Sequence, residues 1–262
     1  MSKNVSITKT QDRGYGSFMV IENDIVGDCI RQLGCWENHL AHYYLKFIKS
    51  TDVIVDAGAN IGFHTVQFAK LANKVYAFEP QKLIFNILST NILLNSVSDF
   101  VEHYRVALGD KPGKLYMEPL SNRRQESGQE NFGGLGLVTE NNGQQEVKVI
   151  TFDSLELDID VLKMDIQGSE PYALKGMENT IDKCTPWIML ENYPDRKPDQ
   201  KVFKWLIDKG YECFRFEQEK ENTWVPHEDC IFYNPEKHIH IKQELDELRA
   251  HIKNLKENSK NA

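Results

Sequence analysis

The stretch Val53-Ile-Val-Asp-Ala-Gly-Ala-Asn-Ile-Gly62 decides the fold of this chain. It begins with three β-branched residues, and a run that is apolar on both faces is typical of a strand at the centre of a parallel sheet. A loop with two glycines follows, and the sequence after it predicts a helix from residue 63 to about residue 71. Strand, glycine loop and helix in this order predict a site where a ligand meets the start of the helix.

The alternation of strand and helix continues along the chain. Further strands are predicted at residues 75–78, 101–108, 161–165, 187–191, 211–216 and 230–233. Further helices are predicted at residues 83–94 and 203–209, and Gly210 stands where a left-handed cap is expected. Alternation of this kind predicts an α/β fold built on a doubly wound sheet.

The first 50 residues are predicted to form a lead-in to this domain, which we place at residues 51–236. Residues 18–21 are a candidate strand, and residues 28–33 fit either a short strand or a helix. Apolar residues at positions 36, 40, 44, 47 and 48 have helical spacing, so we expect an amphipathic helix there.

Two segments depart from the alternation. Residues 119–145 are rich in Gly, Asn, Gln, Ser and Glu, and are either a disordered insertion or a lid over the site. In residues 237–262, apolar residues recur at spacings of four and three, at positions 241, 245, 248, 252 and 255. This terminal helix either packs on its own domain or joins copies of the chain into a homo-oligomer.

Composition limits the partners of the protein. Of the 262 residues, 40% are hydrophobic and 27% are charged, as in ordinary globular proteins. The net charge of −8 argues against nucleic acid as a substrate and favours a small molecule or a glycan. No apolar run approaches the roughly 18 to 20 residues that a membrane span needs.

The N-terminus and the cysteines indicate a cytoplasmic protein. The first residues lack a basic region followed by an apolar stretch, so no signal peptide is expected. The five cysteines form no Cys-x-x-Cys pair, which predicts reduced, mostly buried thiols and argues against a zinc site.

The residues around the glycine loop narrow the choice of ligand. Gly58 has no Cβ, so a ligand can approach the backbone there. The loop reads Gly-x-x-x-Gly after Asp56, which does not match the dinucleotide fingerprint or the P-loop. Glu79 ends the next strand, at the position where a carboxylate accepts hydrogen bonds from ribose hydroxyls. These features predict a site for a nucleoside that carries an amino-acid group.

With these motifs the chain resembles the FkbM family of class I Rossmann-like methyltransferases, over roughly residues 35–193. The motifs that carry the resemblance are Asp56-Ala-Gly-Ala-Asn-Ile-Gly62, Phe78-Glu-Pro80, Asn91 with Asn95, Ala107-Leu-Gly-Asp110, Thr151-Phe-Asp-Ser-Leu155 and Leu162-Lys-Met-Asp-Ile-Gln-Gly-Ser-Glu170. The resemblance implies a seven-stranded sheet with one antiparallel strand, S-adenosylmethionine as cofactor, and O-methylation of a sugar, polyketide or similar hydroxyl. Gln167 departs from the family pattern, which has Glu there, and this puts metal binding or base chemistry at position 167 in doubt.

The resemblance also implies which residues hold the cofactor. The predicted cofactor-binding residues are Glu37, Asp56, Gly58, Asn60, Gly62, Glu79 and Ala107. Trp36-Glu37 resembles a Trp/Tyr-Glu pair that precedes the first motif in relatives. Glu37 is expected either to reach the amino group of the methyl donor or to form a surface salt bridge.

The predicted catalytic residues are Asp165, Glu191, Glu170 and His64. Asp165 and Glu191 end two strands, and ligands lie outside the carboxyl ends of such strands. Glu170 either caps the helix that it begins or contacts the acceptor. His64 either accepts a proton or packs within its helix. We expect His39 and His42 on a helix surface.

A metal site is predicted at the same sheet edge. Asp165, Glu191 and Asn192 offer the oxygen ligands that Mg²⁺ prefers. Alternatively, these groups bind the acceptor hydroxyls or act as base without a metal.

The sequence argues against three other functions. An N-methyltransferase would share the cofactor, but the chain lacks the Asn/Asp-Pro-Pro-Tyr motif of enzymes that methylate amides and bases. A non-catalytic cofactor-binding module is argued against by the intact loop and Glu79. The spacing of the glycines excludes a nicotinamide dehydrogenase.

Overall fold

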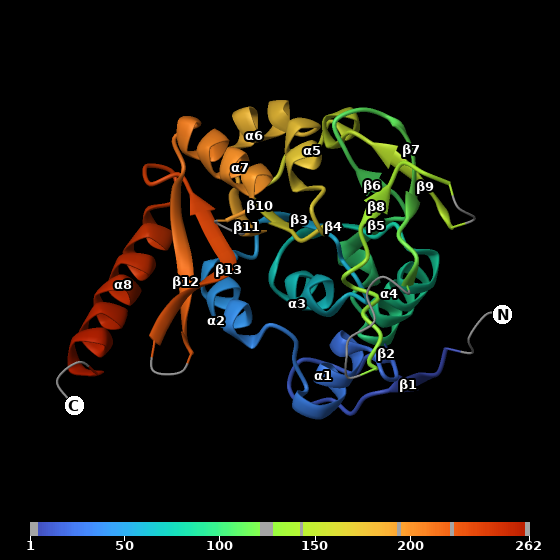
Figure 1. The fold of residues 1–262 in the computed structure, drawn as a ribbon. Coiled ribbons are helices and arrows are strands. Elements are labelled where there is room, and N and C mark those ends of the chain that lie inside the picture. The colour runs from blue at the N-terminus through green and yellow to red at the C-terminus, as the bar shows by residue number, and fades with distance from the viewer. Residues whose placement is uncertain (1–4, 121–127, 142–143, 193–194, 221–222, 260–262) are drawn as a thin grey trace.

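The computed structural model describes residues 5–120, 128–141, 144–192, 195–220 and 223–259 (Figure 1). Its centre is a seven-stranded sheet in the order β12-β13-β11-β10-β3-β4-β5. The strands are β3 (Val53–Ala57), β4 (Lys74–Phe78), β5 (Val101–Tyr104), β10 (Val161–Met164), β11 (Trp187–Glu191), β12 (Glu212–Lys220) and β13 (Thr223–Tyr233). In this sheet β13 runs opposite to the other six strands, so the predicted doubly wound sheet with one antiparallel strand is confirmed.

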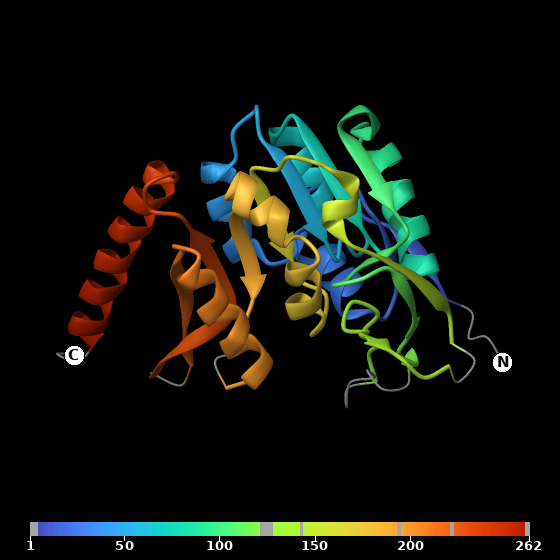
Figure 2. The same ribbon diagram turned by 90° about the horizontal axis from the view of Figure 1, so that it is seen from above.

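Helices cover both faces of the sheet (Figures 1 and 2). One face carries α1 (Ile25–Leu33), α2 (Asn38–Phe47), α3 (Phe63–Leu71) and α4 (Lys82–Leu94), and the other carries α5 (Glu170–Lys175), α6 (Glu178–Cys184) and α7 (Lys197–Asp208). Side chains alternate between the two faces of a strand. Ile54 of β3 therefore joins the core under α1–α4, while Val55 joins the core under α5–α7. Short 3₁₀ helices lie at Ser98–Phe100 and Phe152–Leu155.

The lead-in is a hairpin followed by the helices α1 and α2. Strands β1 (Ile7–Lys9) and β2 (Met19–Ile21) pair antiparallel, and the ambiguous residues 28–33 belong to α1. Asn91 of α4 joins this lead-in to the domain. Its Nδ2 donates to the carbonyls of Met19 and Ile61, and its Oδ1 accepts from the Met19 amide.

The prediction of one strand over residues 101–108 is wrong. The chain leaves the large sheet after Tyr104, where β5 is the edge strand. It then forms β6 (Ala107–Leu108) in a second sheet, of order β6-β9-β7-β8. Strands β7 (Gly113–Met117), β8 (Leu137–Val138) and β9 (Glu146–Ile150) were not predicted.

The segment 119–145 packs on the domain where the structure describes it. Phe132 is buried in the core, and its carbonyl accepts a hydrogen bond from the Gln81 side chain. Residues 121–127 and 142–143, also part of the predicted lid, lie outside the described residues.

The C-terminal helix α8 (Ile239–Ser259) lies at the end of the molecule opposite α4 (Figures 1 and 2). Ile241 and Leu245 of the heptad pattern are fully buried in the core of their own chain, and Leu248 and Ile252 pack against it. This part of the pattern therefore packs on its own domain. Self-association through α8 stays a prediction.

Two expectations from composition can be compared with the described residues. No helix among them has the length and apolar character of a membrane span. All five cysteines are free thiols, but only Cys230 is buried and the other four are partly exposed, so mostly buried thiols were wrongly predicted.

Replacing Asn91 with alanine is predicted to lower the free energy of unfolding by roughly 2–4 kcal/mol, because it leaves buried backbone groups of the lead-in and glycine loop without partners. Urea unfolding measures the loss. Asn86→Ala, at an exposed position of the same helix, should change stability by less than about 0.5 kcal/mol. Equal effects would contradict a structural role for Asn91.

Candidate active site

The site begins with a close approach between two neighbouring strand ends. A Cβ on Gly58 would lie 1.8 Å from the carbonyl oxygen of Asp165, and Gly58 has φ +79°. Only glycine fits this position, since a side chain would meet backbone and L residues rarely adopt that φ. The loop after β3 therefore lies directly against the loop after β10.

The amides of the glycine loop are used within the chain. Gly58 and Ala59 donate to the Phe78 carbonyl, Asn60 donates to Glu79 Oε2, and Gly62 donates to the Ala59 carbonyl. The Ile61 amide donates to the side chain of Asn60. Residues 58–62 thus do not offer the free N–H groups that a phosphate-binding loop would.

One cleft lies between this loop and the second sheet, and we call it the Glu79 cleft. It encloses about 590 Å³ of empty space, part of it open to solvent. Its lining includes Gly58, Asn60, Glu79, Ala107, Gly133, Leu135 and Asp165. Four predicted cofactor residues therefore meet in one cleft, and the segment 119–145 forms part of its wall.

Glu79 is the buried carboxylate of this cleft. Its Oε2 accepts from the Asn60 amide at 3.1 Å, and its Oε1 accepts from the Gln81 amide at 2.8 Å. Burial raises the pKa of Glu79 to about 7, although these two hydrogen bonds oppose the shift. Each oxygen keeps a second lone pair, with which it can accept a hydrogen bond from a ligand.

A buried lysine, which the sequence patterns did not single out, joins β10 to β3. Lys163 Nζ donates to the Gly58 carbonyl at 3.1 Å and lies 3.6 Å from Asp56 Oδ1. Burial alone would lower the pKa of Lys163, but the carboxylates of Asp56 and Asp165 raise it above its ordinary value. The sequence signal is a lysine inside the otherwise apolar strand Val161–Met164.

The other oxygen of Asp56 accepts a hydrogen bond from the Thr65 hydroxyl at 2.6 Å. Asp56 is fully buried, and its Oδ1 accepts no hydrogen bond from the described residues.

A second cleft lies on the other side of Asp165, and we call it the Glu37 cleft. It has about 310 Å³ of empty space, and its charged lining residues are Glu37, Lys163, Asp165, Glu191 and Asp229. Asp165 lines both clefts. Four carboxylates against one ammonium make the second cleft a favourable environment for a cation.

Asp165 is held by its neighbour at the position where the family pattern has a glutamate. Gln167 Nε2 donates to Asp165 Oδ1 at 2.6 Å. A carboxylate at position 167 would repel Asp165, whereas the amide supplies a proton donor. Burial raises the pKa of Asp165, partly offset by Lys163.

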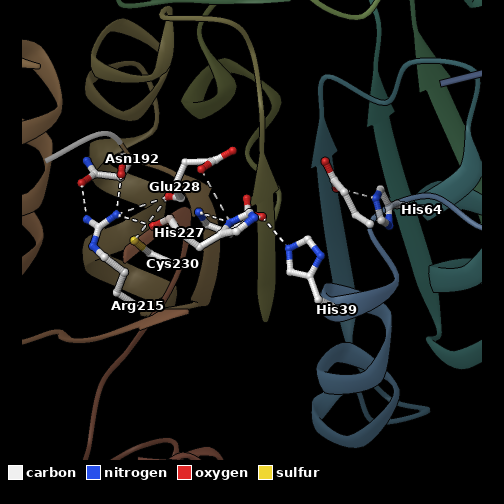
Figure 3. Close-up of polar contacts among 9 residues, drawn as sticks. His39, His64, Asn192, Arg215, His227, Glu228 and Cys230 are labelled. Atoms are coloured by element: carbon white, nitrogen blue, oxygen red, sulfur yellow. Dashed lines mark hydrogen bonds and ion pairs between the residues drawn. The ribbon is translucent and has the colours of Figure 1, made fainter. Parts of the chain in front are cut away.

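The predicted Mg²⁺ ligands are not brought together as a set. Asp165 and Glu191 both line the Glu37 cleft. The buried Asn192 instead accepts a hydrogen bond from Arg215 through its Oδ1 at 2.8 Å (Figure 3). Its side chain also donates to the Asp199 carbonyl. Its amide is used in packing β11 against β12, so the arrangement does not support Asn192 as a ligand.

Glu170 and His64 lie outside the linings of both clefts. Glu170 is buried, and its Oε1 accepts from the Ile166 amide, so it caps the loop before its own helix. Burial raises the pKa of Glu170 to about 7. The His64 ring packs between Tyr44 and Phe68. These contacts favour the capping and packing alternatives over catalysis.

Glu37 does reach the site. It adopts φ +46° at the start of α2 and accepts a hydrogen bond from His64 Nε2 at 2.9 Å (Figure 3). Burial opposes ionisation, but the bond from His64 holds the pKa of Glu37 below its usual value. The partner of Glu37 is thus the buried His64, and not an exposed side chain as in the surface salt bridge that the sequence allowed.

His39 lies exposed on the surface of α2, as predicted, and it also bonds to β13. Its Nε2 lies 2.7 Å from Asp229 Oδ2, and His227 Nδ1 lies 3.1 Å from the same oxygen. These hydrogen bonds hold the pKa of Asp229 at about 2, against the effect of burial. The cluster joins α2 to β13 across 190 positions, a distance at which sequence spacing gives no signal. Nothing is described of the His42 side chain.

With this geometry in view, comparison with known proteins gives a clear result. Residues 56–213 match the model of the methyltransferase FkbM domain. The chain belongs to the FkbM methyltransferase family. It is 27% identical to the methyltransferase sdnD of Sordaria araneosa over 70% of this chain and 81% of that one. It is 30% identical to the hexuronic acid methyltransferase AglP of Haloferax volcanii, over 55% of this chain and 58% of that one.

A solved structure agrees on the fold. The FkbM methyltransferase from Methylobacillus flagellatus aligns with a TM-score of 0.50 at 17% identity. The match covers 71% of this chain, which spans 44% of the length of that one. The protein is thus a methyltransferase with the α/β fold of its family.

Gly58→Ala is predicted to cost at least about 3 kcal/mol of stability, because the added Cβ meets the Asp165 carbonyl as well as an unfavourable φ. Gly14→Ala is a matched control, since Gly14 has φ +105° but open space around it, and should cost about 1–2 kcal/mol. If urea unfolding shows equal losses of stability for the two variants, the close approach of the two loops does not restrict position 58 to glycine.

Proposed function

We propose that the protein is an S-adenosylmethionine-dependent O-methyltransferase that acts on a hydroxyl of a sugar or similar small molecule. The observation that carries the proposal is the position of Asp165, which lines both the Glu79 cleft and the Glu37 cleft. A donor in the first cleft and an acceptor in the second would meet at this carboxylate.

The residues of the Glu79 cleft fit the cofactor. The second lone pairs of Glu79 suit the two ribose hydroxyls, and Gly58 lines the same cleft. Ala107 and Pro80 offer the flat apolar walls that an adenine needs. When bound, the cofactor supplies an activated methyl group on a sulfonium.

The candidate partner for the positive amino group of the donor is Glu37, which lines the second cleft together with Asp165. Asp56 is fully buried and lines neither cleft, so it acts through Lys163 rather than on the donor. Lys163 offsets part of this negative charge and keeps the strand ends together.

A hydroxyl acceptor needs a group that takes its proton, and Asp165 is the candidate. Its raised pKa makes it a stronger base than an ordinary aspartate. Glu191 lines the same cleft and is the second candidate. The acidity of the whole chain argues against nucleic acid as acceptor. The similarity to a hexuronic acid methyltransferase supports a sugar or sugar-acid acceptor.

Binding of S-adenosylhomocysteine is predicted to strengthen as the pH rises toward 7 and to level off above it. Glu79 has a pKa of about 7 and must lose its proton to accept both ribose hydroxyls, so protons compete with the ligand below that pH. Calorimetric titrations from about pH 5.5 to about pH 8.5 measure this slope.

Glu79→Gln should bind at least about tenfold more weakly at about pH 8 and lose the pH dependence. Glu170→Gln is the matched control, because Glu170 also has a pKa of about 7 but lies outside the cleft lining. A slope that survives in Glu79→Gln, or disappears in Glu170→Gln, would contradict the assignment to Glu79.

Asp165→Asn is predicted to reduce methyl transfer to hydroxyl acceptors by about 10²–10⁴-fold while changing the affinity for S-adenosylhomocysteine only a few-fold. Transfer of a labelled methyl group to a panel of sugars, uronic acids and amines measures the effect. Unchanged turnover in the variant, or transfer to amines alone, would favour an N-methyltransferase.

A further inference from the structure

Two histidines and an aspartate meet at the edge of the Glu37 cleft. His39 comes from the first turn of α2, and His227 and Asp229 come from β13. One nitrogen from each imidazole and one carboxylate oxygen all lie within 4.8 Å of one another. Figure 3 shows His39 reaching across from α2 toward His227 on β13. Asp229 also lines the Glu37 cleft.

The spacing of these atoms fits a single metal ion. The oxygen Asp229 Oδ2 lies 2.7 Å from His39 Nε2 and 3.1 Å from His227 Nδ1. Ligand atoms that share one metal at bond lengths of roughly 2.1 Å lie about 3.0–3.4 Å apart in octahedral or tetrahedral geometry. Small side-chain shifts would bring all three ligands to such distances.

The surroundings of the cluster also suit a cation. The His39 ring lies with its edge toward the buried Phe216, at 5.9 Å between centroids, and this apolar wall limits solvent on one side. On the other side the Glu37 cleft adds Glu37, Asp165 and Glu191 against Lys163 alone. The side chain of His39 is 38% exposed, so an ion can enter from solvent.

We propose that His39, His227 and Asp229 bind a divalent transition-metal ion such as Zn²⁺, Mn²⁺ or Co²⁺ at the edge of the Glu37 cleft. Two imidazole nitrogens and one carboxylate are the donor set that such ions prefer, whereas Mg²⁺ and Ca²⁺ prefer oxygen ligands. The site differs from the Asp165–Glu191–Asn192 set that the sequence suggested.

The site would also define the acceptor, and this step rests on the proposed function. Three protein ligands leave coordination positions open. An acceptor that presents two neighbouring oxygens, such as a hydroxyl beside a carboxylate or a vicinal diol, would fill them. The metal would lower the pKa of the bound hydroxyl, and a nearby carboxylate such as Asp165 would take the proton.

Titration of the metal-stripped full-length protein with Co²⁺ tests the proposal without any turnover. We expect one ion per chain, visible d–d absorption typical of nitrogen and oxygen ligands, and displacement by Zn²⁺. His39→Ala, His227→Ala and Asp229→Asn should each weaken binding by at least about tenfold. His251→Ala, on the exposed surface of α8, is the matched control and should bind Co²⁺ like the unmodified protein.

Three results would overturn the proposal: no stoichiometric Co²⁺ binding, binding that all three variants retain, or a loss in His251→Ala equal to theirs. Titration of each variant with S-adenosylhomocysteine shows that its fold is intact and separates the two claims. Metal binding without cofactor binding would contradict only the proposed function. Cofactor binding without metal binding would contradict only the proposed metal site.

Discussion

The buried ammonium of Lys163 holds the centre of this molecule together. It bonds to the Gly58 carbonyl and pairs with Asp56, so it joins the carboxyl ends of β3 and β10 where two clefts meet. A buried charge persists only with such compensation, because removing it from water costs several kcal/mol. The close packing of Gly58 against the Asp165 carbonyl brings the ends of the same two strands together.

Hydrogen-bond partners allow several carboxylates to lie close together in the site without destabilising the fold. Glu79 is surrounded by backbone donors, Glu37 accepts from His64, and Asp229 accepts from two histidines. Each carboxylate therefore has its own partner, and their combined charge still favours a cationic ligand. A sulfonium donor, whose charge disappears when it gives up its methyl group, suits such a site.

The sequence predicted the parts of the fold that local patterns encode. The strand Val53–Ala57, the helix Phe63–Leu71 and the ribose-binding position of Glu79 follow from apolar runs and glycine spacing, and the first two are confirmed. How the chain leaves the sheet after Tyr104 could not be predicted, since it depends on pairing with the distant strand β9. The orientation of Asn192 and the meeting of His39 with Asp229 depend on tertiary contacts in the same way.

Lys163 of β10 differs from these cases, because its signal is present in the sequence. A single charged residue in a strand that is buried on both faces needs a partner at the same depth, and Asp56 is its paired residue on the neighbouring strand β3. Once β3 and β10 are known to be neighbours, pairing their buried charges connects the two motifs.

The most direct test of this arrangement is a crystal structure of the protein with S-adenosylhomocysteine. We expect the ribose hydroxyls on Glu79, the adenine beside Ala107, and the sulfur directed toward Asp165 and the Glu37 cleft. A ligand bound elsewhere, or one in the Glu79 cleft with its sulfur directed away from Asp165, would contradict the central role of Asp165 between the two clefts.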